Sequence, residues 1–182
     1  RAEASQRQAR NGLGLIGGSV ARAVRLHAGG AAELVAWTPG GTGPAAALAA
    51  GVLDGAAGTV EAALDGADLV VLAAPPRACL DLLDRVGGAR ALLAPNATVT
   101  DVASTKARLT ERAAAAGVPY VGGHPMAGRE TSGYGAAEPS LFEGRPWIVT
   151  EPVAGGDPAV VERLAAWCRA DVIRVTAAEH DE

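Results

Sequence analysis

The sequence predicts an α/β protein with a doubly wound, mostly parallel sheet. Short apolar runs alternate along its 182 residues with amphipathic segments of helical length. A glycine-rich loop opens the series, and polar segments follow several of the apolar runs. Alternation of this kind favours βαβ units, in which parallel strands lie in the middle and helices cover both faces of the sheet.

Each predicted strand is a short apolar run that turn residues bound. The clearest run is DLVVLAAPP, which two prolines end. In chain order the strands are predicted at residues 32–37, 68–76, 97–104, 118–123, 145–150 and 171–176.

Each predicted helix combines apolar residues at helical spacing with a start or stop signal. Asp157 as N-cap and Pro158 at the first helical position begin the last helix, and Gly117 ends the helix before it. In chain order the helices are predicted at residues 19–27, 44–50, 59–67, 77–88, 104–117 and 157–170.

Three glycines at the start of the chain stand in the spacing G-x-G-x-x-G. In Rossmann-like, dinucleotide-binding domains the first glycine allows a tight turn and the second lets the backbone approach the pyrophosphate. The third lets the helix pack on the sheet, and the helix N-terminus attracts the phosphates. The chain has 24 glycines, so this spacing alone is a weak signal. We expect contacts with NAD or NADP from Gly12, Leu13, Gly14, Leu15, Ile16, Gly17, Thr38, Ala74 and Pro75.

The choice between NAD and NADP stays open. The strand at residues 32–37 ends in Trp37-Thr38-Pro39, where NAD enzymes usually place a carboxylate for the ribose 2′-hydroxyl. Neither that carboxylate nor an arginine for a 2′-phosphate is present there.

Residues 1–10 do not fit the series, because RAEASQRQAR is polar where a doubly wound fold needs a buried first strand. Either that strand has been replaced, or ARNGLGLI holds a degraded one. We therefore divide the chain into an atypical polar segment at 1–10, a dinucleotide-binding domain at 11–176 and the start of a further domain at 177–182.

Composition excludes several classes of partner. The net charge is −4, with no basic stripe for nucleic acid, and one Phe and two Tyr do not make a stacking platform. No apolar run approaches the ~20 residues of a membrane span. Cys79 and Cys168 lie far apart in apolar helical patterns, which favours two buried thiols in a cytoplasmic protein over a disulfide or a metal site.

A histidine follows one of the buried strands at the edge where a doubly wound sheet binds ligands. His124 precedes Pro125, which favours an extended backbone. An ordinary pKa of ~6.5 suits proton transfer near neutral pH, so His124 is a candidate base. A structural loop histidine is the alternative. His27 is expected to be incidental, and His180 to be an exposed or tertiary-contact residue.

Several stretches together resemble the prephenate/arogenate dehydrogenase family: GLGLIGGS, DVASTK, GGHPMAGRETSGYGAA, LFEGRPWIVT and EHD. The resemblance runs from Gly12 to Asp181, and the HPMAG stretch is long and unusual. It implies NAD(P)-dependent oxidative decarboxylation in tyrosine biosynthesis, of prephenate to 4-hydroxyphenylpyruvate or of arogenate to tyrosine. Hydride leaves the ring carbon that bears the 4-hydroxyl, and the ring carboxylate leaves as carbon dioxide.

The same resemblance implies roles for single residues. His124 would accept the proton of the substrate hydroxyl, and Ser104 would hydrogen-bond to it. Arg129 would bind a substrate carboxylate, and Glu130 would orient Arg129 or gate the site. Some of these residues have another interpretation. Ser104 could be the N-cap of the following helix, and Arg129 with Glu130 could be a plain surface pair. Lys106, in the same S-x-K segment, could be a solvated helix residue. No metal site is expected.

Members of the family continue past EHD into a helical domain that forms the dimer and completes the substrate site. We expect this chain to be the nucleotide-binding part without that domain, inactive or nearly so by itself, and the full-length protein to be a homodimer. Two other functions stay open. One is another Rossmann-type oxidoreductase, such as a β-hydroxyacid dehydrogenase, and the other is a non-catalytic nucleotide-binding module.

Overall fold

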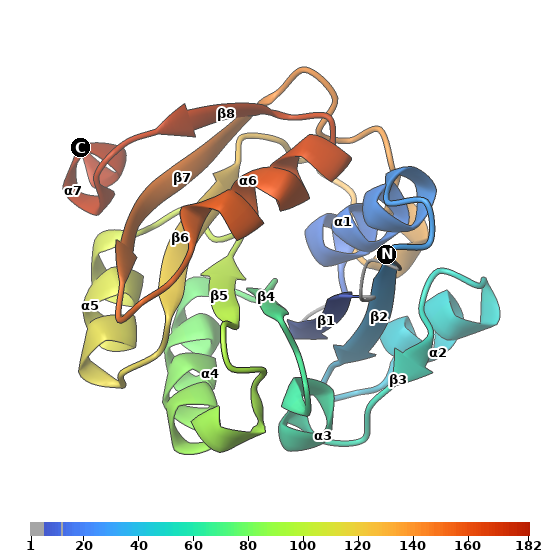
Figure 1. Cartoon of the computed structure of the whole chain (residues 1–182). Coiled ribbons are helices and arrows are strands. Elements are labelled where there is room, and N and C mark those ends of the chain that lie inside the picture. The colour runs from blue at the N-terminus through green and yellow to red at the C-terminus, as the bar shows by residue number, and fades with distance from the viewer. Residues whose placement is uncertain (1–5, 12) are drawn as a thin grey trace, which may run out of the picture.

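Eight strands form one sheet in the order β3-β2-β1-β4-β5-β6-β7-β8 (Figure 1). The computed structural model describes residues 6–11 and 13–182. The strands are β1 (Gln6–Asn11), β2 (Ala32–Trp37), β3 (Gly55–Ala56), β4 (Leu69–Leu72), β5 (Thr98–Asp101), β6 (Tyr120–Pro125), β7 (Pro146–Val153) and β8 (Asp171–Arg174). The helices are α1 (Leu15–His27), α2 (Thr42–Ala49), α3 (Val60–Leu64), α4 (Pro76–Gly88), α5 (Ala107–Ala115), α6 (Pro158–Trp167) and α7 (Ala177–Asp181), with 3₁₀ turns η1 (Arg90–Leu92) and η2 (Tyr134–Ala136).

Every neighbouring pair of strands is parallel except β6 and β7, which are antiparallel. The chain runs outward from β1 through β2 to β3, then returns to β4 on the other side of β1. The crevice beyond the carboxyl ends of β1 and β4 is therefore the topological switch point, where doubly wound sheets bind ligands. The predicted fold class, a doubly wound and mostly parallel sheet, is confirmed.

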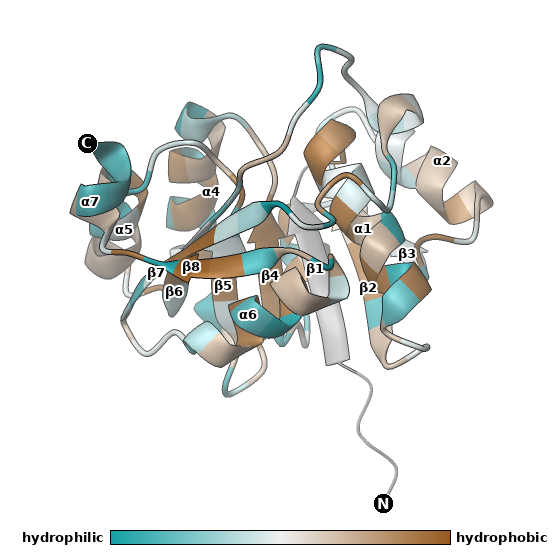
Figure 2. Cartoon of the chain, turned by 90° about the horizontal axis from the view of Figure 1, so that it is seen from above, coloured by the Kyte–Doolittle hydropathy of each residue, from teal (hydrophilic) through white to brown (hydrophobic). Residues whose placement is uncertain are grey.

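Two apolar clusters lie on opposite faces of the sheet. Val24 of α1 and Leu164 of α6 belong to one cluster. Leu64 of α3, Leu83 of α4 and Leu109 of α5 belong to the other. Figure 2, seen from above, shows α4 and α5 on one side of the sheet and α6 on the other. Both cysteines are buried and free, as the sequence predicts.

The polar start of the chain forms a strand, contrary to the expectation for residues 1–10. The backbone of Gln6–Asn11 pairs with β2 on one side and β4 on the other, at the centre of the sheet. Two parallel neighbours satisfy its backbone groups from both sides, which overrides the unfavourable composition. Residues 1–5 lie outside the described residues.

Candidate functional site

The glycine loop lies at the carboxyl end of β1, where α1 begins. Gly14 is the N-cap of α1, and the first turn of this 13-residue helix carries no acidic side chain, so nothing there competes with an anion for the N-terminus. Leu13 and Gly17 are buried, while Gly14, Leu15 and Ile16 are half-buried. Gly12 lies outside the described residues.

A cavity of about 500 Å³ adjoins this loop. Leu13, Gly14 and Thr38 line one part of it, and the segment Gly133–Gly135 lines another. Tyr134, which also lines it, has a buried hydroxyl without a hydrogen-bond partner in the part of the chain that the structure describes. A free helix N-terminus and an orphaned phenol beside one cavity fit a dinucleotide.

The remaining predicted cofactor contacts lie at the same edge of the sheet. Thr38 follows β2, and its hydroxyl accepts a hydrogen bond from the Gly41 amide at 3.1 Å. Pro75, exposed, is the N-cap of α4, and the carbonyl of half-buried Ala74 accepts from the Cys79 thiol at 3.2 Å. Burial raises the pKa of that thiol to about 11, so Cys79 is a packed, protonated group and not a nucleophile.

His124 is half-buried near the carboxyl end of β6. Its Nδ1 lies 2.9 Å from Nε2 of His180, whose own Nδ1 lies 2.8 Å from Oδ1 of Asp181. A carboxylate only accepts, so His180 donates through Nδ1 and, as a neutral ring, accepts at Nε2 from Nδ1–H of His124. This order leaves Nε2 of His124 with a free lone pair, the form that a base needs.

The surroundings of His124 favour the neutral imidazole. Burial lowers its pKa below the ordinary value of 6.5, the nearby Lys106 ammonium and His180 lower it further, and the Asp101 carboxylate acts in the opposite direction. The predicted tertiary contact of His180 is confirmed. His27, expected to be incidental, lies with its Nδ1 2.8 Å from the Trp167 carbonyl.

The segment that carries Ser104 differs from the sequence prediction. The helix begins at Ala107, with Lys106 as its N-cap, so the interpretation of Ser104 as N-cap is wrong. Asp181 caps this helix instead, because its carboxylate accepts from the amides of Lys106 at 2.8 Å and Ala107 at 2.9 Å. Ser104 itself is exposed in the turn between β5 and α5.

Lys106 is fully buried and paired with the equally buried carboxylate of Asp101, which contradicts the interpretation of Lys106 as a solvated helix residue. Sequence reasoning missed Asp101 and Tyr120, whose hydroxyl donates to Oδ1 of Asp101 at 2.7 Å. A signal for Asp101 was present, because the residue stands at the carboxyl end of a buried strand next to the S-x-K segment.

The loop after His124 folds back onto α1. Arg129 is exposed and pairs with Glu138 at 2.6 Å, not with Glu130, so neither the surface pair nor the orienting contact of Arg129 with Glu130 is present. The Glu138 amide in turn donates to the Ser19 hydroxyl of α1 at 2.9 Å. Glu130 is exposed. The loop thereby connects the strand that carries His124 to the helix that begins at the glycine loop.

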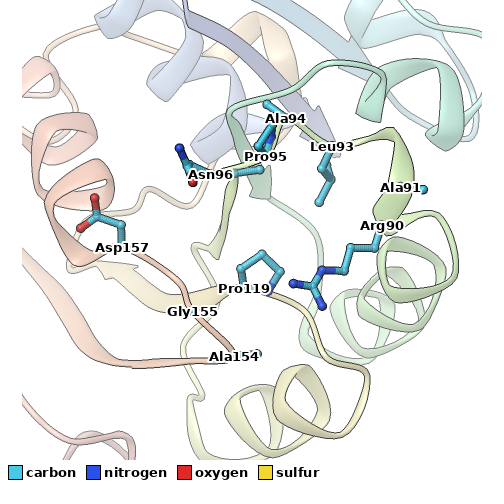
Figure 3. A pocket seen from close by; sticks show the side chains of 11 residues that line it. Arg90, Ala91, Leu93, Ala94, Pro95, Asn96, Pro119, Ala154, Gly155 and Asp157 are labelled. Atoms are coloured by element: carbon cyan, nitrogen blue, oxygen red, sulfur yellow. The ribbon is translucent and has the colours of Figure 1, made fainter.

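A larger cavity, about 680 Å³, lies at the other end of the strands (Figure 3). Residues just before β5 and β6, including Asn96 and Pro119, line it together with Arg90 and Asp157. Asp157 already caps α6, accepting from the Ala159 amide at 3.0 Å. Parallel sheets bind ligands beyond the carboxyl ends of their strands, and this cavity lies at the opposite end from His124.

Neither a metal cluster nor a membrane helix occurs in the described ranges. The residues 6–11 and 13–182 contain no group of three His, Cys, Asp or Glu placed to hold a metal ion. In the same part of the chain, every helix is too short or too polar to traverse a bilayer.

Residues 22–173 match the family model described as prephenate dehydrogenase, nucleotide-binding domain. The chain belongs to this family. It is 33% identical over 176 residues to the prephenate dehydrogenase of Bacillus subtilis, a match covering 93% of this chain and 46% of that protein. The Lactococcus lactis prephenate dehydrogenase is 34% identical over 119 residues, covering 63% of this chain and 32% of that protein.

Solved structures of the same family share the fold. The arogenate dehydrogenase of Synechocystis superposes with a TM-score of 0.85 at 29% identity, covering 96% of this chain and 61% of that one. A prephenate dehydrogenase from A. aeolicus, in complex with hydroxyphenyl propionate and NAD⁺, also gives 0.85, at 26% identity over 99% of this chain and 63% of that one. The chain thus spans from a third to about half of these curated relatives and less than two thirds of these solved chains.

Proposed function

We propose that the full-length protein catalyses the NAD(P)-dependent oxidative decarboxylation of prephenate to 4-hydroxyphenylpyruvate, or of arogenate to tyrosine. One observation carries the proposal: a half-buried histidine held in its neutral form stands at the same sheet edge as a cavity beside a free helix N-terminus. Family membership supports the same reaction.

In this proposal the chain binds the cofactor through the glycine loop, Thr38, Ala74 and Pro75. The pyrophosphate lies against the N-terminus of α1, whose amides are free to bind it. A bound nicotinamide supplies the acceptor for the hydride. The residues at the end of β2 favour neither the ribose 2′-hydroxyl of NAD nor the 2′-phosphate of NADP, so both cofactors are to be tested.

His124 moves the proton, and Ser104 orients the hydroxyl that carries it. Nε2 of His124 takes the proton of the 4-hydroxyl as hydride leaves the same carbon, which gives a ring ketone. Loss of the ring carboxylate as carbon dioxide then leaves its bonding electrons in the ring, which becomes a phenolate. His124 returns the proton to the phenolate oxygen. Arg129, exposed in the loop after His124, is proposed to bind a substrate carboxylate, and the exposed Glu130 beside it is proposed to gate the substrate site.

The proposal extends to the setting of the protein. We propose a cytoplasmic homodimer that forms through a helical domain beyond residue 176. The two free, buried thiols suit a reducing compartment. Val172 and Ile173 of β8 are exposed at 38% and 44%, which suits cover by further chain. Light scattering on the full-length protein measures its mass and tests the dimer.

The deciding experiment follows formation of the reduced cofactor by the full-length protein, with prephenate and arogenate each offered with NAD⁺ and NADP⁺. His124→Asn is expected to lower kcat by about 100- to 10,000-fold while the Kd for the cofactor changes less than about twofold. His27→Asn, a histidine in α1 bonded to the Trp167 carbonyl, is the matched control and should keep kcat.

Turnover that survives His124→Asn would remove the proposed base. Cofactor binding without turnover of either substrate would favour the non-catalytic module, and turnover of a 3-hydroxy acid would favour the β-hydroxyacid dehydrogenase. The M. tuberculosis 3-hydroxyisobutyrate dehydrogenase, at 17% identity and a TM-score of 0.65, shares the fold alone.

A further inference from the structure

A buried charged pair lies next to the two segments that carry Ser104 and His124. The Lys106 ammonium and the Asp101 carboxylate are both fully buried and hydrogen-bonded to each other. Lys106 is the only lysine of the chain, whose other 15 basic residues are arginines. Lysine side chains are almost never fully buried unless they are paired, so the position of Lys106 inside the protein is unusual.

Asp101 fixes both segments at once. Oδ2 accepts from Lys106 and, at 2.9 Å, from the Ala103 amide, next to Ser104. Oδ1 accepts from Tyr120 at 2.7 Å and, at 3.1 Å, from the Gly123 amide, next to His124. The Asp101 carboxylate thus binds the backbone amide immediately before each of the two residues proposed to contact the substrate hydroxyl, Ser104 and His124.

The pairing of β5 with β6 explains why a side chain, and not the backbone, connects these two segments. Strands β5 and β6 pair in register only at Val99 and Tyr120, so the regular backbone ladder between them does not continue to their carboxyl ends. The Asp101 carboxylate bonds to the Gly123 amide there in place of the ladder. The stem of Lys106 passes so close to β6 that a Cβ on Gly122 would lie 2.9 Å from its Cδ.

Stability alone is a poor reason for this pair. Removing two ions from water costs several kcal/mol each, and well-packed neutral residues often serve a core as well or better. Burial first, and then the Asp101 charge, raise the pKa of Tyr120 well above its usual value, so the phenol stays a donor to Asp101. The Asp101 carboxylate accepts four hydrogen bonds, from Lys106, Tyr120 and the amides of Ala103 and Gly123, as a positioning group requires.

We propose that Lys106 is a positioning residue, which through Asp101 fixes the segments that carry Ser104 and His124 and whose ammonium acts on the His124 ring. This inference rests on the proposed function for the role of His124 as a base, but the contacts of Lys106 and Asp101 do not depend on turnover.

Among the described residues, three segments place titratable groups against His124. Asp101 comes from β5, Lys106 from the start of α5, and His180 with Asp181 behind it from α7. On the remaining side, β7 places Ile148 opposite His124. The Lys106 ammonium lowers the pKa of His124 more than the Asp101 carboxylate raises it. Removing the ammonium therefore favours the imidazolium, even when the carboxylate is removed with it.

The test compares three variants of the full-length protein. Lys106→Met removes the ammonium, and the double variant Asp101→Asn/Lys106→Met removes both charges, so no uncompensated ion is left in the core if the single variant fails to fold. Arg108→Met removes an exposed cation two residues away and is the matched control. Each is measured by the pH profile of kcat/KM and by NMR titration of the His124 ring, assigned through His124→Asn.

We expect the His124 titration, and the acid limb of kcat/KM, to move to higher pH in both Lys106 variants and to stay at the wild-type position in Arg108→Met. The plateau of kcat/KM should fall by on the order of 10- to 100-fold in Lys106→Met, since displaced segments misplace the reacting groups. A purely structural lysine would lower the plateau without moving the titration.

The proposal is overturned if the His124 titration in the folded double variant coincides with the wild type or moves to lower pH. It is also overturned if Lys106→Met keeps a wild-type plateau. Should the wild-type protein turn over neither substrate, the proposed function fails, while the NMR titration still decides the role of Lys106.

Discussion

Replacing Gly123 with alanine changes the strand immediately before the proposed base, at a point where two strands lie too close for any side chain. An added Cβ would lie 2.6 Å from the Asp101 carbonyl oxygen, 2.9 Å from Thr100 Oγ1 and 3.2 Å from Trp147 Nε1. Ordinary carbon contacts begin near 3.5 Å, so β6 must move by about 0.5–1 Å. Overpacking of this kind costs about 1–3 kcal/mol of unfolding free energy.

The same movement displaces His124, the next residue. A misplacement of about 1 Å can lower kcat/KM on the order of 100-fold, so Gly123→Ala should lose activity out of proportion to its stability. Urea unfolding gives the stability and reduced-cofactor formation gives the rate. Gly128→Ala is the matched control, because a Cβ there meets nothing within 4 Å, and it should change stability by less than about 0.5 kcal/mol. Equal stability of the two variants would refute the reasoning from strand spacing.

Four further outcomes are expected, two from single substitutions and two from the pKa of His124. Tyr120→Phe removes the 2.7 Å donor to the buried Asp101 carboxylate and should cost about 2 kcal/mol in urea unfolding; an unchanged midpoint would show that another donor replaces it. Asp157→Ala removes the cap on the Ala159 amide and should cost about 1 kcal/mol, measured the same way and contradicted by a neutral result. Because burial, with the nearby Lys106 ammonium, lowers the pKa of His124, the acid limb of kcat/KM should lie below pH 6.5, and a limb above it would contradict the electrostatics. For the same reason the unfolded chain takes up this proton first, so stability should fall as pH drops below 6.5, and His124→Asn should flatten that dependence.

Local pattern predicted most of the fold because most elements carry their own signal. The strand at 32–37 and the cap at Asp157 appear as predicted. The strand Gln6–Asn11 could not be predicted from composition, because its pairing comes from neighbours 26 and 61 residues further along, as in Gln6 with Ala32 and Gln8 with Leu69. The antiparallel direction of β7 was missed for a similar reason, since the long loop before it allows either direction.

The candidate site, too, was predicted from the sequence where its signals are local and missed where they depend on tertiary contacts. The strand preceding His124 and the short motif around it were visible in sequence, whereas the start of α5 was not. Ser104 looked like a cap because caps are usually local, but the cap comes from Asp181, about 75 residues away. Lys106 looked solvated because lysine usually is, and only the tertiary pairing with Asp101 shows otherwise.

The fold also explains why distant motifs bear on the glycine loop. The loop after His124 returns to α1 through the Glu138 amide and Ser19, and a Cβ on Gly18 would lie 2.8 Å from the Ala137 Cβ. The segment that follows the proposed base thus packs on the helix that begins at the glycine loop. The position of the segment after the HPMAG stretch is therefore coupled to the position of α1. The spacing of the glycines is weak evidence by itself, and this contact between α1 and the segment after His124 supports the proposed cofactor site more strongly.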